Sequence, residues 1–127
     1  MPQITFDLNF TTEEISCKCG CGNDNISIPL MQKVQIIRWV VGRSLVVTSG
    51  VRCEAYNKQV GGEDDSEHVP TEDRPGEGVD LEVTNSKLRR SVIFLATILK
   101  LRIGDGDGFI HLGIRPTKPK GVLWNYY

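Results

Sequence analysis

Two histidines and one aspartate are the residues of this chain best suited to hold a metal ion. His68 and His111 are the only histidines among its 127 residues, and Asp80 lies between them. Two imidazoles and a carboxylate leave the fourth position of a tetrahedral zinc ion open to water. Zinc lowers the pKa of that water and polarises a carbonyl group, as amide hydrolysis requires. The three residues form a candidate catalytic zinc site, although such residues also occur as hydrogen-bonded strand histidines or surface loop histidines.

An acidic segment contains two of these three residues. Eight of the 16 acidic residues lie between Glu63 and Asp80, and only Arg74 opposes them there. A charge run of this kind is typical of a solvated loop. A bound divalent ion would also relieve the repulsion between the carboxylates. A site built from oxygen ligands alone, as calcium prefers, is a separate hypothesis in which the two histidines stay apart.

The overall charge and hydropathy exclude several classes of protein. The net charge of −1 does not fit a general nucleic-acid binder. No apolar run approaches the roughly 20 residues that span a bilayer, so we expect no membrane insertion. The N-terminus lacks the basic and then apolar pattern of a secretory signal, which predicts synthesis in the cytoplasm. The length predicts a single domain, residues 1–127, and we expect a monomer.

Alternating side chains predict two strands that could bring Asp80 and His111 together. Apolar residues at 79, 81 and 83 alternate with acidic ones, and the segment 109–115 alternates in the same way. Asp80 and His111 each lie on the face opposite the apolar residues of their strand. If the two strands are neighbours, both polar groups point into one cleft, and His68 can reach it from the acidic loop.

The remaining elements favour an α+β fold. A capping box at Thr11–Glu14 predicts a short helix. Two longer helices are predicted after Ser27 and after Asn85, each with apolar residues at helical spacing. Further short strands are expected at 45–47 and 121–124, one or two helical turns at 54–60, and a flexible glycine-rich turn at 104–108. Helices flanking a small antiparallel sheet are the natural arrangement of these elements.

A series of short motifs resembles the zinc D-alanyl-D-alanine carboxypeptidases and endopeptidases, in the small form common in phages and prophages. The resemblance runs in order from about residue 7 to about residue 117. The segments that carry it are Ser49-Gly50-Val51-Arg52, Tyr56-Asn57, Gly61-Gly62, Ser66-Glu67-His68, Gly76-Glu77-Gly78-Val79-Asp80 and Phe109-Ile110-His111. Each segment is weak alone, and together they are fairly specific.

The resemblance implies a fold, an activity and a set of site residues. It implies the small α+β fold that these peptidases share with the hedgehog signalling domain. It implies a zinc hydrolase acting on D-alanine-containing bonds of peptidoglycan stem peptides, as in a phage endolysin that acts on the cell wall. The zinc ligands of the family map onto His68, Asp80 and His111, and two of its polar site residues map onto Arg52 and Ser66.

Arg52 and Ser66 each have a second interpretation. A guanidinium group binds carboxylates in a bidentate fashion, so Arg52 could hold a terminal carboxylate of the substrate. It could equally form a salt bridge to the acidic loop. The Ser66 hydroxyl could hold the substrate or simply form a turn.

Two departures from the family pattern concern the loop and the proton acceptor. The first two ligands are twelve residues apart here and seven in the family, so about five residues, roughly 71–75, lengthen the acidic loop. The family's acidic residue before or after the last histidine is replaced by Gly108 and by Gly113. Because hydrolysis requires a proton acceptor, we assign that role to Asp107, the nearest acid, with Asp105 and Glu77 as others. Asp-Gly turn chemistry also explains Asp105 and Asp107. A non-catalytic zinc-binding recognition module on the same fold is the alternative.

Four cysteines form a second group that could bind a metal. Three alternate with other residues in Cys17-Lys18-Cys19-Gly20-Cys21, and Cys53 follows Arg52. They could remain free thiols, form up to two disulfides, or hold a second zinc ion, although the usual Cys-x-x-Cys spacing is missing. The sequence leaves these three states open.

Overall fold

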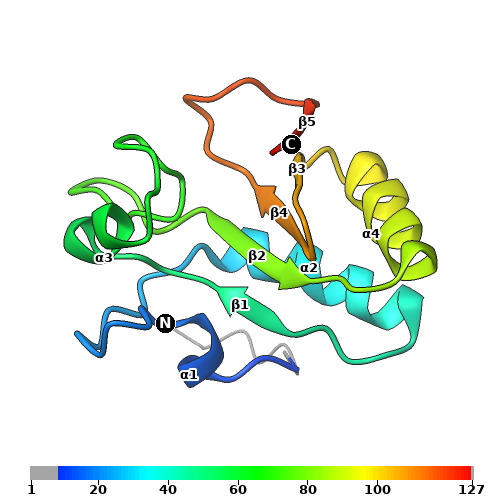
Figure 1. Cartoon of the computed structure of the whole chain (residues 1–127), viewed down its shortest axis with the longest axis horizontal. Coiled ribbons are helices and arrows are strands. Elements are labelled where there is room, and N and C mark those ends of the chain that lie inside the picture. The colour runs from blue at the N-terminus through cyan, green and yellow to red at the C-terminus, as the bar shows by residue number, and fades with distance from the viewer. Residues whose placement is uncertain (1–8, 127) are drawn as a thin grey trace.

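A five-stranded sheet forms the centre of the molecule. The computed structural model describes residues 9–126. The strands are β1 (Val47–Ser49), β2 (Gly78–Glu82), β3 (Arg102–Asp105), β4 (Phe109–Gly113) and β5 (Leu123–Asn125), in the spatial order β1-β2-β4-β3-β5. Neighbouring strands are antiparallel except β3 and β5, which are parallel. Together with four helices, this sheet confirms the predicted α+β class (Figure 1).

The helices begin where the sequence offers caps. The Thr11 hydroxyl and the Glu14 side chain form the predicted capping box at α1 (Thr12–Ile15). Ser27 caps α2 (Ile28–Val41), which ends at Gly42 in the left-handed conformation. Asn85 caps α4 (Ser86–Ile98), and the Cys53 sulfur occupies the capping position of α3 (Glu54–Gln59). None of the helices in residues 9–126 has the length and apolar character needed to cross a membrane.

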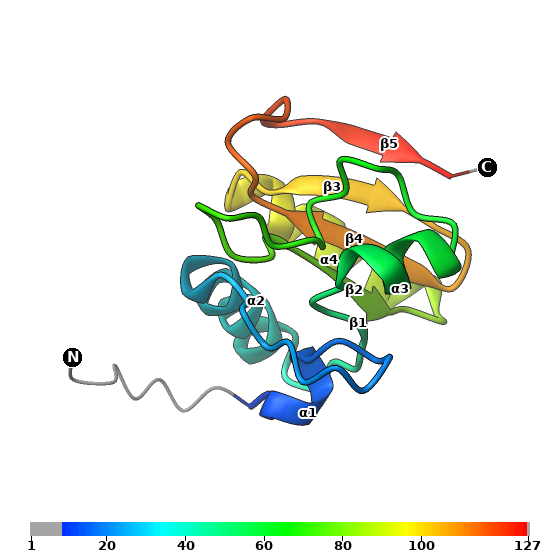
Figure 2. The ribbon, with the colours of Figure 1, turned by 90° about the vertical axis from the view of Figure 1, so that its left-hand side faces the viewer.

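The hydrophobic core lies between the sheet and the two long helices. Figures 1 and 2 show α2 and α4 on one side of the sheet and α3 on the other. Apolar side chains from β2 and β4 pack with those of the two helices, including Leu30, Val34, Leu81, Val92 and Ile110. The opposite face of β2 and β4 is therefore free to carry polar groups.

The glycine-rich segment after α4 differs from the sequence-based expectation. We expected a flexible turn at 104–108, but residues 102–105 form strand β3. A Cβ atom at Gly104 would lie 2.8 Å from the rings of both Trp124 and Tyr126. Gly104 thus lets the aromatic side chains around β5 lie directly on the β3 backbone, which explains a glycine inside a strand.

Pairing of β2 with β4 brings the two predicted strand residues together. Asp80 lies directly opposite His111 in the antiparallel register. Both side chains are on the face away from the apolar core, as the strand alternation predicts. The sheet therefore fixes two of the three candidate ligands through backbone pairing.

Candidate metal centre and its cleft

His68, Asp80 and His111 converge on one point at the face of the sheet. His68 Nε2 lies 3.2 Å from Asp80 Oδ1 and 3.1 Å from His111 Nδ1, and His111 Nδ1 lies 2.9 Å from Asp80 Oδ1. All three residues are buried, with exposed fractions of 3 to 8%. The 43 positions that separate the two histidines are thus closed by the fold, and the hypothesis of histidines that stay apart is wrong.

The hydrogen bonds on the far side of each imidazole leave unshared electron pairs facing one another. His68 Nδ1 lies 2.7 Å from the Gly50 carbonyl oxygen, which can only accept, so this nitrogen carries the proton. His111 Nε2 donates to Glu67 Oε1 at 2.6 Å. In the neutral rings, His68 Nε2 and His111 Nδ1 are then bare and meet each other and a carboxylate oxygen. Three such electron-pair donors can hold a cation between them.

The spacing of the three atoms fits zinc. A tetrahedral ion with metal–ligand bonds near 2.05 Å places its ligand atoms about 3.3 Å apart. The observed separations of 2.9 to 3.2 Å lie within a few tenths of an ångström of that value. Two imidazoles and a carboxylate, each held by a partner on its far side, are a donor set that zinc accepts.

Burial and mutual contacts shift the pKa values of all three groups. Burial would raise the pKa of Asp80, but the close contacts of its carboxylate with His111 and His68 outweigh it and hold the pKa well below its usual range. Burial lowers the pKa of His68. Burial would also lower the pKa of His111, but its bonds to Asp80 and Glu67 outweigh this and raise it. Asp80 is therefore ionised and ready to bind a cation.

Glu67 also belongs to the site, although its sequence position gave no sign of this. Its carboxylate is buried and accepts hydrogen bonds from His111, from Arg102 Nε at 3.2 Å and from the backbone N–H of Arg115. A Cβ atom at Gly113 would overlap this carboxylate. The carboxylate of Glu67 thus occupies the space that a side chain at position 113 would need. The sequence shows that position 113 lacks an acid. It does not show that the carboxylate of Glu67, 46 positions earlier, lies in that place.

A second glycine makes room for the same contact. A Cβ atom at Gly78 would lie 2.8 Å from both Glu67 Cγ and His111 Cε1. Both Gly78 and Gly113 are strand residues opposite each other in the β2–β4 register. The pair opens a slot across the two strands, and Glu67 fills it beside the ring of His111.

Arg52 fixes the second oxygen of Asp80. Its Nη2 donates to Asp80 Oδ2 at 3.2 Å, its Nε to Ser49 Oγ at 2.9 Å and its Nη1 to Asn57 Oδ1 at 3.2 Å. Arg52 therefore forms a salt bridge, but its partner is Asp80 of strand β2 and not a residue of the acidic loop. Arg52 also lines the cleft beside the three ligands.

Ser66 has the turn role that the sequence allowed. Its hydroxyl accepts the backbone N–H of His68 at 3.2 Å, and Val69 N–H bonds the Ser66 carbonyl at 3.1 Å. This turn presents His68 to the sheet. Ser66 also lines the cleft.

The acids considered as proton acceptors lie apart from the three ligands. Asp107 is exposed in the turn between β3 and β4 and is not one of the described residues that line the cleft. Asp105 is paired with Arg89. Glu77 is buried and bonded by both Arg74 and Arg115. Among the described residues, the carboxylates that line the cleft are Glu63, Glu67 and Asp80.

The lengthened acidic loop is anchored by an arginine from beyond β4. Arg115 donates to the carbonyls of Val69 and Pro75 at 3.0 and 2.9 Å, and its Nε bonds Glu77. The loop thus closes at both ends on one buried guanidinium. The added residues leave the ligand His68 in place because the loop is held on both sides of them.

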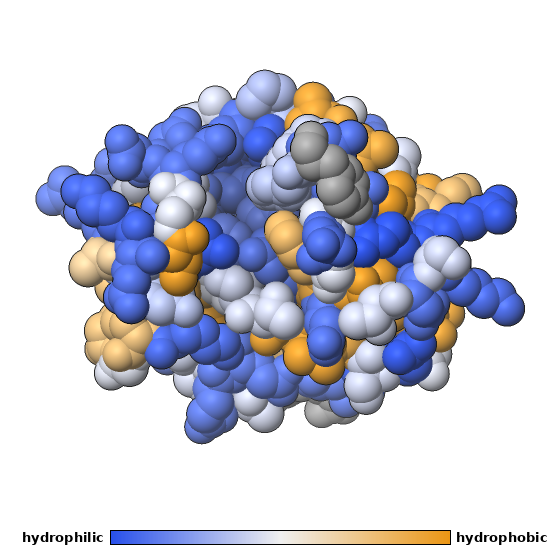
Figure 3. Space-filling view, viewed as in Figure 1, coloured by the Kyte–Doolittle hydropathy of each residue, from blue (hydrophilic) through white to orange (hydrophobic). Residues whose placement is uncertain are grey.

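The three ligands lie at the base of a cleft of about 560 Å³. Trp124 and Tyr126 form an aromatic wall, and the guanidinium of Arg102 lies 4.9 Å from the centre of the Trp124 ring. Lys118 adds another positive charge to the lining. Figure 3 shows a recess with mostly hydrophilic walls on this face of the molecule. The cleft is therefore open to a polar, anionic ligand and has an apolar wall for a small side chain.

Comparison with known proteins agrees with this geometry. A family model described as Peptidase M15 matches residues 8–113, which include all three ligands of the candidate centre. No curated protein matches the sequence. The resemblance to the zinc D-alanyl-D-alanine peptidases is thereby confirmed, and the chain belongs to the Peptidase M15 family of zinc-dependent peptidases.

Proposed function

We propose that this protein hydrolyses D-alanine-containing peptide bonds of peptidoglycan stem peptides, with zinc held by His68, Asp80 and His111. The observation that carries the proposal is the meeting of two bare imidazole nitrogens and one ionised carboxylate at the base of an open cleft. Family membership supports a peptidase reaction at this place. The activity is that of a carboxypeptidase or of an endolysin-type endopeptidase that acts on the cell wall.

The chain's own residues prepare the site for this chemistry. When bound, zinc supplies a Lewis acid that makes water nucleophilic near neutral pH and polarises the scissile carbonyl. The Gly50 carbonyl and the Glu67 carboxylate hold the two imidazoles in the tautomers that leave the inner nitrogens free. Arg52 holds the second oxygen of Asp80, so that the first oxygen faces the histidines.

The walls of the cleft fit the end of a stem peptide. A terminal D-alanine combines a carboxylate with a single methyl group. Arg52 and Lys118 place positive charge in the lining, and Arg52 can bind the carboxylate while still contacting Asp80. Trp124 offers an apolar surface to the methyl group.

Two carboxylates are proposed as proton acceptors. Asp107 is the candidate from the sequence, and its turn precedes Phe109, which lines the cleft. Glu63 is the candidate from the cleft, because no described residue forms an ion pair with its side chain. Glu67 is already engaged by His111, Arg102 and Arg115, which suits a positioning role. Comparing Asp107→Asn with Glu63→Gln assigns the role.

Metal analysis and product analysis test the proposal together. His68→Ala and His111→Ala should each bind one zinc ion fewer per chain than the wild type. The wild type should also release D-alanine or cut cross-links in purified peptidoglycan. A stem peptide ending in L-alanine is the matched control substrate and should remain intact. A zinc content unchanged from the wild type in both histidine variants would refute the metal site, and zinc-loaded protein without products would refute the hydrolase.

A non-catalytic recognition module is the second candidate. Its support is the glycine at 108 and at 113 together with the position of Asp107 outside the cleft lining. In that case the zinc-loaded protein binds stem peptides, with affinity that depends on Arg52, and leaves them uncut. Equilibrium binding measured beside the product assay separates the two functions.

A further inference from the structure

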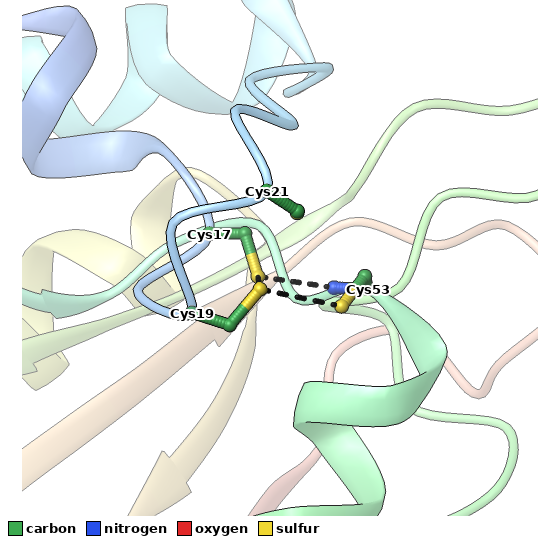
Figure 4. A group of neighbouring side chains, drawn as sticks. All are labelled: Cys17, Cys19, Cys21 and Cys53. Atoms are coloured by element: carbon green, nitrogen blue, oxygen red, sulfur yellow. Dashed lines mark hydrogen bonds between the residues drawn. The ribbon is translucent and has the colours of Figure 1, made fainter.

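Four cysteines meet at a place outside the cleft. Cys17, Cys19 and Cys21 belong to the loop that follows α1, and Cys53 precedes α3. Figure 4 shows the side chains of Cys17, Cys19 and Cys53 turned toward one another between these two segments. The four sulfur atoms all lie within 4.8 Å of one another. Two segments more than 30 positions apart thus bring every cysteine of the chain to one point.

The sulfur separations fit a tetrahedral metal ion. Cys17 Sγ lies 3.4 Å from Cys19 Sγ, which in turn lies 3.7 Å from Cys53 Sγ. Zinc bonds to sulfur near 2.3 Å, so the sulfurs of a tetrahedral site lie about 3.8 Å apart. Cys17 and Cys21 are also separated by three residues, within the range usual for structural zinc sites.

The sulfur contacts do not single out two separate cysteine pairs. Both of the short sulfur contacts share Cys19, so the two shortest contacts cannot both be disulfide bonds. The four cysteines are present as thiols. A single centre with four ligands accounts for all of them at once.

The backbone around the sulfurs is shaped for ligands. The N–H of Cys53 donates to Cys17 Sγ, and the N–H of Tyr56 donates to Cys53 Sγ, both at 3.4 Å. The loop closes through Cys17 N–H to the Asn23 carbonyl at 2.9 Å, and Gly20 turns it with a φ of 87°. N–H groups directed at sulfur are the partners that support bound thiolates.

We propose that Cys17, Cys19, Cys21 and Cys53 form a structural zinc site, distinct from the centre in the cleft. Four thiolates complete the coordination of the ion and leave no position for water or substrate. The site therefore holds two segments of the chain together and takes no part in hydrolysis. The inference does not depend on the proposed peptidase activity.

The segments that it joins support the candidate active site. The Val51 N–H donates to the Ile15 carbonyl at 2.8 Å, and Gly50 lies so close that a Cβ atom there would overlap this carbonyl. Gly50 accepts the hydrogen bond of His68, and Arg52 contacts Asp80. A zinc ion at the cysteines would clamp the loop after α1 onto the turn that carries both contacts.

Zinc counting in the full chain tests the proposal. Under reducing conditions, the wild type should bind two zinc ions per chain. Cys53→Ser and Cys21→Ser should each bind one, and so should the double variant His68→Ala/His111→Ala. Ser16→Ala, a substitution beside the cysteine loop that removes no sulfur, is the matched control and should keep two. Cys21→Ser changes an exposed side chain, so it remains informative if Cys53→Ser fails to fold.

Cobalt substitution gives an independent signature of sulfur ligands. The double histidine variant loaded with Co²⁺ should retain intense sulfur-to-metal charge-transfer absorption, and Cys21→Ser in that background should reduce it strongly. One zinc per wild-type chain that disappears in the double histidine variant would overturn the proposal. So would a mass lower by two or four hydrogens in protein purified without reductant and shown to be free of zinc.

Discussion

The two metal-binding clusters of this molecule are built in different ways. In the histidine and aspartate cluster, Asp80 and His111 lie on paired strands and His68 lies on a turn beside them. All three are buried, and each has a hydrogen-bond partner on its far side. The cysteine cluster lies on loops, with Cys19 and Cys21 exposed. Strand pairing and buried hydrogen bonds fix the ligands of the first cluster. The other consists of loops that a metal ion would hold together.

This difference has a functional logic. A catalytic ion needs ligands in fixed positions and one open position, which a rigid sheet supplies. A structural ion needs enough ligands to close its coordination, and loops can adjust to provide them. The contact between Ile15 and the residues around Gly50 connects the clusters, so the loop site can stabilise the surroundings of the sheet site.

The largest expected effect comes from removing a ligand on the sheet. His111→Ala should lower kcat/KM on peptidoglycan peptides by more than about 100-fold, because loss of a mere supporting residue already costs about 10- to 100-fold in comparable sites. The sheet-site zinc should be lost while the cysteine zinc remains. Steady-state kinetics and zinc content check both statements, and simultaneous loss of both zinc ions would contradict the independence of the clusters.

The cysteine cluster should affect stability more than chemistry. In the His68→Ala/His111→Ala background, only the cysteine site remains to bind zinc. Free zinc at about 100 times the dissociation constant should then raise the free energy of unfolding by about 2.7 kcal/mol. Denaturant titrations with and without zinc measure this difference. The matched chain with Cys53→Ser added should show no zinc-dependent change, and an equal gain there would place the stabilising ion elsewhere.

Substitution of Glu67 tests how much the hydrogen bond behind His111 contributes to the sheet site. Glu67→Gln should lower both zinc affinity at the sheet site and kcat/KM by about 10- to 100-fold, because a neutral amide supports the His111 ring less well than a carboxylate. Competition with a chromogenic chelator measures the affinity, and kinetics measure the rate. Glu72→Gln, an exposed acid of the same loop, is the matched control and should match the wild type.

Moving the carboxylate from position 67 to position 113 tests whether Glu67 takes the place of an acid at position 113. Gly113→Asp alone should be damaging, because its side chain would overlap the Glu67 carboxylate. Combined with Glu67→Ala, the same substitution should regain part of the lost zinc affinity. Additive losses in the double variant would mean that the two positions do not share one role.

Much of the sheet site could be predicted because strand alternation has a strict period of two. That period placed Asp80 and His111 on the polar faces of their strands, and the pairing of β2 with β4 confirmed it. Helix caps at Thr11, Ser27 and Asn85 were also predicted and observed. These features depend on neighbours in sequence or on one regular element.

Features that depend on distant contacts were not predictable in the same way. Glu67 reaches the slot beside Gly113 only because two strands and a loop meet there. Strand β3 was not predicted, because Gly104 is typical of a turn. Its place in the strand depends on the rings of Trp124 and Tyr126, which lie against it. The cysteines were recognised as possible ligands, but nothing in their spacing showed that Cys53 reaches the other three.

The smallest expected effect concerns Asp107, the residue that the sequence favoured as proton acceptor. Asp107 is exposed in the β3–β4 turn and does not belong to the described lining of the cleft, so Asp107→Asn should change kcat by less than about threefold. Glu63→Gln, at the cleft wall, should reduce kcat more strongly and serves as the comparison. A loss of 100-fold or more in Asp107→Asn alone would mean that the turn closes over bound substrate. Catalysis would then combine ligands fixed by the sheet with an acid delivered by a loop.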